Sequence, residues 1–420
     1  MKNKSFIYYY QLLLCLVVYL QIVSPKISSI SIILLVLFSF IGFFRNKLEF
    51  KFNFSITILA LFYLAYLIGT YFTSNSNLDL ANHYLESKLS FLIFPIIFSF
   101  KSEFKLKFNF LFIATILGVF HASLIGILSA IKCSMTSGFT FSCFSSSNIS
   151  SIHHPSYFSV FILCGILMMW LGFYLKWKWF LLKWIIPLSI YFLFFYFLCQ
   201  SLAGLLFLIA IVFGFFIFQI ERKIGRNKVI IIAILFPFIV FICLSKLPIY
   251  KVDFNSTVDS FTVFIKNPKK FVESKTLYKT GNEERMVLWS ITVSLIKQYP
   301  FGVGTGNVDD FLIVELLKFK QSSLAFKKYN PHNQFLQTTL EIGFIGLLIL
   351  LIFIVISFKT AFKNKDWLLV MILSTLVFNS LFESMLQRQS GIVFYSFWIC
   401  LLLIYPFNLN SSKEVEARGK

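Results

Sequence analysis

Runs of about 20 apolar residues recur along most of this 420-residue chain, and no other feature constrains its fold as strongly. Such a run can cross the hydrocarbon core of a bilayer as an α-helix, whose backbone polar groups are satisfied internally. The composition agrees, since 58% of the residues are hydrophobic and 13% are charged, whereas soluble domains carry roughly 25% charge. We therefore predict an all-α, polytopic integral membrane protein.

About twelve transmembrane helices can be placed on these runs. They cover residues 5–23, 27–44, 54–72, 86–100, 108–131, 155–175, 179–198, 201–220, 228–246, 333–358, 366–383 and 389–407. The chain thus divides into residues 1–246 with the first nine helices, a large loop at 247–332, residues 333–407 with the last three, and a tail at 408–420. The loop is too long for a simple connector, so we expect it to be organised.

The basic residues predict the orientation in the membrane. The chain has 38 Lys and Arg against 18 Asp and Glu, a formal charge of +20. With the N-terminus inside, 21 basic residues fall in cytoplasmic segments, 13 in residues 246–333 and 4 in short outer loops, namely Lys26, Lys88, Lys132 and Arg388. This asymmetry puts both termini in the cytoplasm and the large loop outside. It also explains the positive charge without nucleic acid, for which the chain has no basic soluble domain.

The cysteines and motifs exclude several classes of site. Cys133 and Cys143 share one short predicted loop, where their spacing allows a disulfide in an oxidising space. The other five read as apolar core residues: Cys15, Cys164, Cys199, Cys243 and Cys400. No Cys/His pattern has the spacing of a zinc site, and no P-loop or serine-hydrolase motif is present. We expect no metal and no cofactor.

The large loop has its own pattern of helices and turns. Residues 283–299 read as an amphipathic helix with Met286, Trp289, Val293 and Ile296 at helical spacing. Pro300 ends it, and a glycine-rich turn and a second helix at 308–319 follow. A Lys-rich stretch at 318–328 then leads to the next membrane helix.

The first candidate for chemistry is His332, one of only five histidines. Asn330 is a good N-cap and Pro331 suits the first helical position, which predicts that His332 lies in the first turn of a membrane helix, at the water boundary. An imidazole there can accept a proton near neutral pH. Asn333 is a plausible hydrogen-bonding partner. The alternative interpretation is a polar residue that marks a helix start.

Three further residues are candidates for binding a substrate. Arg285 shares a helix face with Trp289 and is the only Arg among the basic residues of the loop; arginine binds phosphates bidentately, although a surface arginine is the alternative. His154 follows His153 at the outer mouth of the sixth span, where interface positioning is the alternative. Arg388 clusters with Glu383 and Gln387 at the turn between the last two spans. Ionisable residues near the membrane are functional candidates, but a short turn can also be solvated.

Taken together, these residues resemble the O-antigen ligase and O-antigen polymerase superfamily. The matching pattern is Arg285-x-x-x-Trp289, then Pro300-x-Gly302-x-Gly304-x-Gly306-Asn307, then His332-Asn333-x-x-Leu336, then Gly343-x-x-Gly346. It covers about 60 residues, while the predicted topology matches over the whole chain. The chain departs from the family where Ser201-Leu202 replaces a Ser-Arg pair and where His154-Pro155-Ser156 replaces Asn-Pro-Asn. Either Arg388 or His154 supplies the missing polarity, or this member of the superfamily handles a different substrate.

The resemblance implies an inverting glycosyltransferase in the bacterial inner membrane that acts in lipopolysaccharide biosynthesis. It implies transfer of a glycan from undecaprenyl pyrophosphate to lipid A–core at the periplasmic face, without metal or nucleotide. His332 would activate the acceptor hydroxyl and Arg285 would contact the donor pyrophosphate. Alternatives are an O-antigen or capsule polymerase with the same donor, or a ligase that glycosylates protein. A polysaccharide transporter is disfavoured, because the polar residues collect at the outer face and no internal repeat is visible.

Overall fold

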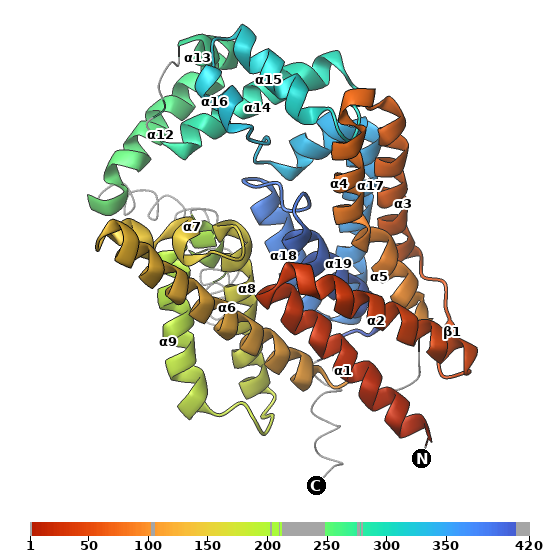
Figure 1. The fold of residues 1–420 in the computed structure, drawn as a ribbon. Coiled ribbons are helices and arrows are strands. Elements are labelled where there is room, and N and C mark those ends of the chain that lie inside the picture. Colours follow the sequence, from red (N-terminus) through yellow and green to blue (C-terminus); the bar gives the residue numbers. More distant parts are fainter. Residues whose placement is uncertain are drawn as a thin grey trace, which may run out of the picture.

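A computed structural model describes residues 2–101, 106–201, 204–209, 211, 248–274, 278 and 280–408, and these fold almost entirely as α-helix. The predicted span at 228–246, Cys243 and residues 409–420 of the predicted tail lie outside them, and the span at 201–220 lies largely outside. The described helices form two hydrophobic cores, one in a large bundle and one in a smaller group of helices over its end (Figure 1).

The bundle uses the helices that the apolar runs predict. Their bounds are α1 Lys2–Val23, α2 Pro25–Phe44, α3 Phe54–Gly69, α4 Leu78–Lys88, α5 Ser90–Ser99, α6 Phe108–Ser137, α8 Pro155–Tyr174, α9 Leu182–Leu198, α17 Gln334–Asn364, α18 Trp367–Ser380 and α19 Gln389–Ile404. α1 packs against α2 and α6, α3 against α17, and α5 against α19. A two-residue antiparallel pair, β1 (Glu49–Phe50) with β2 (Phe100–Lys101), joins the ends of two connections.

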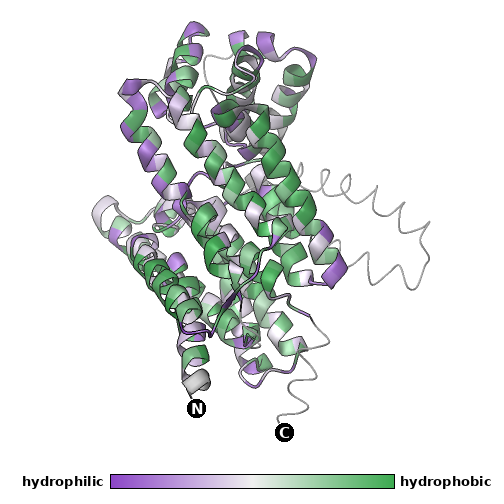
Figure 2. Ribbon diagram, turned by 90° about the vertical axis from the view of Figure 1, so that its right-hand side faces the viewer, coloured by the Kyte–Doolittle hydropathy of each residue, from purple (hydrophilic) through white to green (hydrophobic). Residues whose placement is uncertain are grey.

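Among the described residues, six helices are long and apolar enough by length and composition to cross a membrane. They are α1, α2, α3 with the turn after it, α6, α8 and α17, while α9, α18 and α19 are shorter apolar helices. Hydrophobic residues dominate these helices in Figure 2, and hydrophilic residues gather toward their ends and on the smaller group. The all-α membrane class is confirmed, and the count of twelve spans stays a prediction.

The fourth predicted span differs from the observed helices. Residues 86–100 contain α5, which has only 10 residues and therefore spans about 15 Å, half of the hydrocarbon core. α4 ends at Lys88, with one residue between it and the start of α5, and the two helices follow one another end to end (Figure 1). Lys88, which the charge count assigned to an outer loop, is buried at the end of α4 with no exposed surface.

The smaller group of helices, which we call the cap, comprises α12 to α16. Their bounds are α12 Pro248–Lys266, α13 Pro268–Ser274, α14 Gly281–Gln298, α15 Val308–Lys318 and α16 Ser322–Lys327. α14 and α15 confirm the two helices predicted in the large loop, whereas α12, α13 and α16 were not predicted. The buried face of α14 includes Val287, Ile291 and Leu295, while Val293 from the predicted stripe is 39% exposed. The stripe was therefore placed partly on the wrong face.

The glycine-rich turn docks the cap onto a break in α17. At Gly343 the backbone turns left-handed, with φ of 74°, so α17 is not one continuous helix. The break frees the carbonyls of Leu340 and Glu341, which accept hydrogen bonds from Val303 N (2.8 Å) and Gly304 N (3.1 Å). A Cβ at Gly343 would stand only 2.5 Å from the backbone carbon of Phe301. Glycine is therefore required here, both because φ is positive and because a side chain has no room.

The same turn is fastened to the end of α3 and the segment after it. Thr305 Oγ1 donates to the carbonyl of Tyr66 (2.7 Å), and Thr305 N donates to that of Gly69 (3.2 Å). Asn307 Oδ1 accepts from both the amide and the hydroxyl of Ser74 (3.1 and 2.9 Å). Asn307, which belongs to the motif found in the sequence, thus connects the cap to the bundle by hydrogen bonds.

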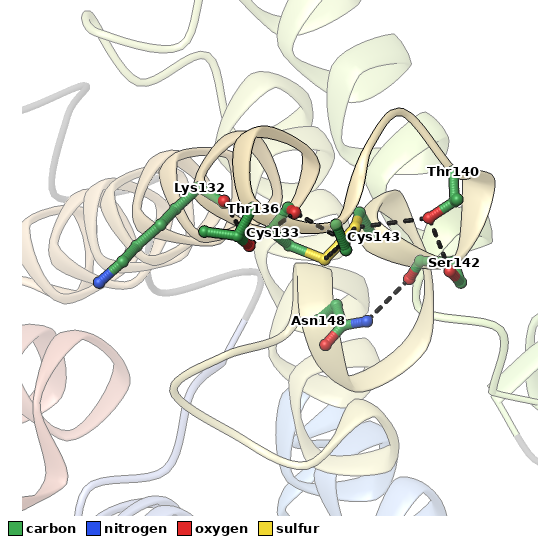
Figure 3. Close-up of a disulfide and its surroundings, with 8 residues drawn as sticks. Lys132, Cys133, Thr136, Thr140, Ser142, Cys143 and Asn148 are labelled. Atoms are coloured by element: carbon green, nitrogen blue, oxygen red, sulfur yellow. Dashed lines mark hydrogen bonds between the residues drawn. A yellow bond between two sulfur atoms is a disulfide. The ribbon is translucent and has the colours of Figure 1, made fainter.

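A disulfide joins Cys133 to Cys143, as their spacing allowed (Figure 3). The two residues do not share a loop, because α6 continues to Ser137 and carries Cys133 in its last turns. Cys143 lies in the short helix Phe141–Phe144, which precedes α7 (Ser146–Ile149). The bond ties this connection to the end of α6.

Candidate active site

The structure brings His332 against Glu383, on the turn between α18 and α19. His332 Nδ1 lies 3.0 and 3.1 Å from the two carboxylate oxygens. An ionised carboxylate only accepts hydrogen bonds, so Nδ1 carries the hydrogen and Nε2 is left with its lone pair. The His332 side chain is 17% exposed and that of Glu383 is 6% exposed. This is the arrangement of a general base oriented by a buried carboxylate.

His332 stands outside the helix that was predicted to contain it. α17 begins at Gln334, its N-cap is Asn333, and His332 itself has a left-handed φ of 49°. The carboxamide of Asn330 is a turn acceptor for His332 N (2.9 Å) rather than a helix cap. The ring of Tyr329 packs edge-on against the imidazole, with 5.3 Å between centroids. The backbone turn and this ring direct the imidazole to Glu383.

The turn that carries Glu383 is held from three sides. Ser384 Oγ donates to Asn330 Oδ1 (3.3 Å), which links the turn to the segment before α17. Tyr157 in α8 donates its hydroxyl hydrogen to the Ser384 carbonyl (2.8 Å). Leu386 N donates to the side chain of Gln334, the first residue of α17. Glu383 is therefore positioned by the elements that also position His332.

His154 and Arg285 complete the electrostatics of the site. His154 Nδ1 lies 3.9 Å from a Glu383 carboxylate oxygen. Burial raises the pKa of Glu383, but the hydrogen bond from His332 and the charges of His332, His154 and Arg285 outweigh it and bring that pKa to about 2. Glu383 is therefore ionised at neutral pH. Burial lowers the pKa of His154, while Glu383 raises it and Arg388 lowers it.

Several helices begin at the site and point their positive ends toward it. The N-cap residues are His154 for α8, Asn333 for α17 and Arg388 for α19. Arg285 lies near the start of α14, the central helix of the cap. Helix N-termini carry unpaired N–H groups and a partial positive charge, which favour anions. With Arg285 near Glu383 and Arg388 near His154, the arrangement favours an anionic ligand.

Buried polar atoms at the site are left for a ligand. Within the part of the chain that the structure describes, Arg285 Nε, Trp289 Nε1 and His154 Nδ1 are buried without a hydrogen-bond partner. Arg285 uses Nη1 to donate to the side chain of Asn282 (3.3 Å). Unpaired buried polar groups cost free energy, and Arg285 and His154 lie close enough to influence the pKa of Glu383, so their unpaired atoms indicate a place where a polar ligand binds.

The two adjacent histidines have separate roles. His153 Nε2 contacts the carbonyl of Ile22 (2.6 Å), and its Nδ1 contacts the hydroxyl of Ser390 (2.8 Å). Because a carbonyl only accepts, Nε2 carries the hydrogen and Nδ1 accepts from the serine. Burial lowers the pKa of His153 to about 4, so it is neutral. His153 joins α1, α8 and α19, whereas His154 faces the charged site.

The other predicted site residues have these positions. Asn333 Oδ1 accepts from Leu336 N (3.0 Å) and its Nδ2 donates to the carbonyl of Leu381 (3.0 Å), so its polar atoms are engaged by the backbone. Arg388 is exposed and close enough to influence the pKa of His154. Leu202, where the family arginine is replaced, lies outside the described residues.

Sequence reasoning missed the role of Glu383. It noticed this residue only as part of a polar cluster at a turn, because 51 positions separate it from His332. The available signal was a carboxylate at the end of an apolar run, on the same predicted side of the membrane as the candidate base.

Comparison with known proteins adds one finding. Residues 187–351 match the family model described as O-antigen ligase. This segment contains Arg285, His332 and the glycine-rich turn, and ends before Glu383. The match supports membership of the O-antigen ligase superfamily and confirms the resemblance read from the sequence. No curated protein matches the chain.

Proposed function

We propose, from its membership of the O-antigen ligase superfamily, that this membrane protein transfers a glycan from an undecaprenyl-pyrophosphate carrier to an acceptor hydroxyl, with lipid A–core as the acceptor. The observation that carries the proposal is the contact between His332 Nδ1 and Glu383, 3.0 Å long, among unpaired buried donors. Both termini lie in the cytoplasm, and the site faces the periplasm of the bacterial inner membrane, as the distribution of basic residues favours.

In this proposal Nε2 of His332 removes the proton of the acceptor hydroxyl as its oxygen attacks the anomeric carbon of the donor glycan. The new carbon–oxygen bond forms while the bond to the pyrophosphate oxygen breaks, which inverts the anomeric centre. The electron pair leaves with the pyrophosphate on its lipid. Glu383 holds the imidazole hydrogen at Nδ1 and stabilises the imidazolium that forms.

Arg285 and the surrounding helix N-termini bind the departing pyrophosphate. Its charge increases as the glycan leaves, so fixed positive groups lower the barrier without rearrangement. The guanidinium has a free Nε beside a weakly held Nη1, and a planar fork matches phosphate oxygens. Arg388 adds positive charge at the rim and His154 adds a polar ring, while Asn333 positions His332 by capping α17. Because the leaving group is already activated, this mechanism requires neither metal nor ATP.

The test is the glycolipid pattern of a deletion strain complemented with wild type or with His332→Ala. The variant is expected to insert and accumulate normally and to lose capped core by at least about 10³-fold, the contribution of a general base and its orientation. Undiminished capped core would overturn the proposal. In the deletion strain, loss of all capped core identifies a ligase, whereas a single repeat unit left on the core identifies a polymerase. Unchanged lipopolysaccharide points to a protein acceptor or a transporter.

A further inference from the structure

A second group of buried charges lies beside the candidate site. Lys88, the last residue of α4, and Glu341 in α17 have no exposed side-chain surface, and their charged groups are 3.5 Å apart. The ammonium group also lies over the rings of Tyr66 and Tyr84, at 4.5 and 5.1 Å from their centroids. Glu341 immediately precedes the break in α17.

Stability alone does not account for this pair. Removing two charges from water costs several kcal/mol per ion, and apolar residues of similar volume often stabilise a protein as well or better. Because Lys88 and Glu341 are both inaccessible, neither can touch a substrate. A buried pair of this kind is best explained by what else it holds in place.

The pair holds the turn that carries Glu383. Gln387, four residues after Glu383, accepts a hydrogen bond from Lys88 Nζ and donates one to Glu341 Oε2. Its neighbour Leu386 is tied to the first turn of α17 through its backbone N–H. One amide side chain thus connects a charged pair in the bundle to the turn 381–388.

We propose that Lys88 and Glu341 are positioning residues, which act through Gln387 to keep Glu383 against His332. This inference rests on the proposed function, because it assigns the network to the geometry of that base. Within the ion pair, Lys88 is a fixed donor and Glu341 a fixed acceptor for the side-chain amide of Gln387. A substitution that breaks this link lets the turn move, and a shift of about 1 Å at a catalytic group can cost up to about 10²-fold in rate.

The test compares two glutamines that donate to the same carboxylate oxygen. Gln387 lies on the turn, whereas Gln337 lies within α17, one helical turn before Glu341, and donates to Glu341 Oε2 at 3.1 Å. Gln387→Leu and Gln337→Leu therefore remove equivalent hydrogen bonds from Glu341, but only the first releases the turn. Transfer rates are measured with right-side-out membrane vesicles of the complemented strain across external pH.

Gln387→Leu is expected to lower the rate about tenfold and to change its pH–rate profile, because the turn no longer holds the Glu383 carboxylate against the imidazole of His332. Gln337→Leu is expected to keep the wild-type rate within about twofold and the wild-type profile. Equal losses in the two variants, or a wild-type rate and profile in Gln387→Leu, would overturn the inference.

If Gln387→Leu accumulates poorly in the membrane, a second variant that lacks the buried charges provides the test. Lys88→Met with Glu341→Gln leaves no uncompensated charge, so it is expected to accumulate and to show the same loss of rate. Adding Gln387→Leu to this double variant is expected to cause little further loss, because the three residues act as one unit. Additive losses contradict the inference. His332→Ala distinguishes the proposed function from the positioning role. If His332→Ala is inactive but Gln387→Leu behaves like the wild type, only the positioning role is overturned.

Discussion

Glu341 and Glu383 are both buried carboxylates of the bundle, and their surroundings differ. Glu341 faces Lys88 and two glutamines in a pocket with no exposed side-chain surface. Glu383 faces two histidines at the end of the bundle, near arginines and helix starts, with its partner His332 17% exposed. The first cluster is closed, and the second has access to solvent.

This difference separates a structural charge from a reactive one. In the closed cluster Lys88 and Glu341 face each other without exposed side-chain surface, so a ligand has no access to either charge. In the open cluster the positive groups exceed the single carboxylate, and several donors are unpaired among the described residues. Burial of a charge is therefore a weak guide to function, whereas unpaired polar atoms near a partly exposed imidazole are a stronger one.

Glu383→Gln is the sharpest challenge to the open cluster. The amide can still accept a hydrogen bond from Nδ1, but it does not stabilise the imidazolium, so we expect about 10²- to 10³-fold slower transfer. The transfer rate of Glu383→Gln in membrane vesicles is compared with that of the double variant Lys88→Met with Glu341→Gln. The comparison fails if Glu383→Gln is the milder of these two changes.

Arg285→Lys tests whether the open cluster recognises a phosphate by shape as well as charge. Lysine keeps the charge and loses the planar fork, so we expect about 10²-fold slower transfer. The matched control is Arg388→Lys, at an exposed position, with an expected loss of less than about fivefold. Similar rates for both variants would show that only net charge matters at this end of the bundle.

The adjacent histidines allow the comparison to be made one residue apart. His154→Gln is expected to slow transfer about tenfold and to leave thermal stability nearly unchanged, because it contacts the open site. His153→Gln is expected to lower stability by about 1–3 kcal/mol with little change in transfer, since it loses buried hydrogen bonds to Ile22 and Ser390. Melting in detergent and transfer in vesicles are measured for both; the opposite pattern would exchange their roles.

The last comparison concerns stability in acid. Glu383 has a pKa of about 2 against an ordinary 4.5, which corresponds to about 3 kcal/mol. This stabilisation is complete above pH 4.5 and is lost as the pH falls toward 2. His153, with a pKa of about 4 against 6.5, causes a loss between pH 6.5 and 4. Melting curves of Glu383→Gln should lack the lower phase, and those of His153→Gln the upper one; an unchanged curve for either contradicts its assignment.

Much of this architecture could be predicted because membrane helices and charge asymmetry are local signals. The start of α17 could not, since Asn330 and Asn333 are both good caps; Asn333 caps the helix, while Asn330 Oδ1 accepts from His332 N and from Ser384 Oγ. The partner of His332 could not be predicted either, because the contact with Glu383 depends on how α17, α18 and α19 pack together. Lys88 read as a loop cation because its partner, Glu341, lies 253 positions away.

The break in α17 also has a consequence for biosynthesis. The carbonyls of Leu340 and Glu341 accept hydrogen bonds from the glycine-rich turn, which itself binds the end of α3. In chain order, α3 is synthesised first, the turn next and α17 last. The end of α3 is therefore present when the turn binds it, and the turn is present when α17 binds. A ribosome that delivers the chain from the N-terminus thus supplies the parts in the order of assembly, whereas a circular permutant that starts at α17 would release it into lipid with unsatisfied backbone.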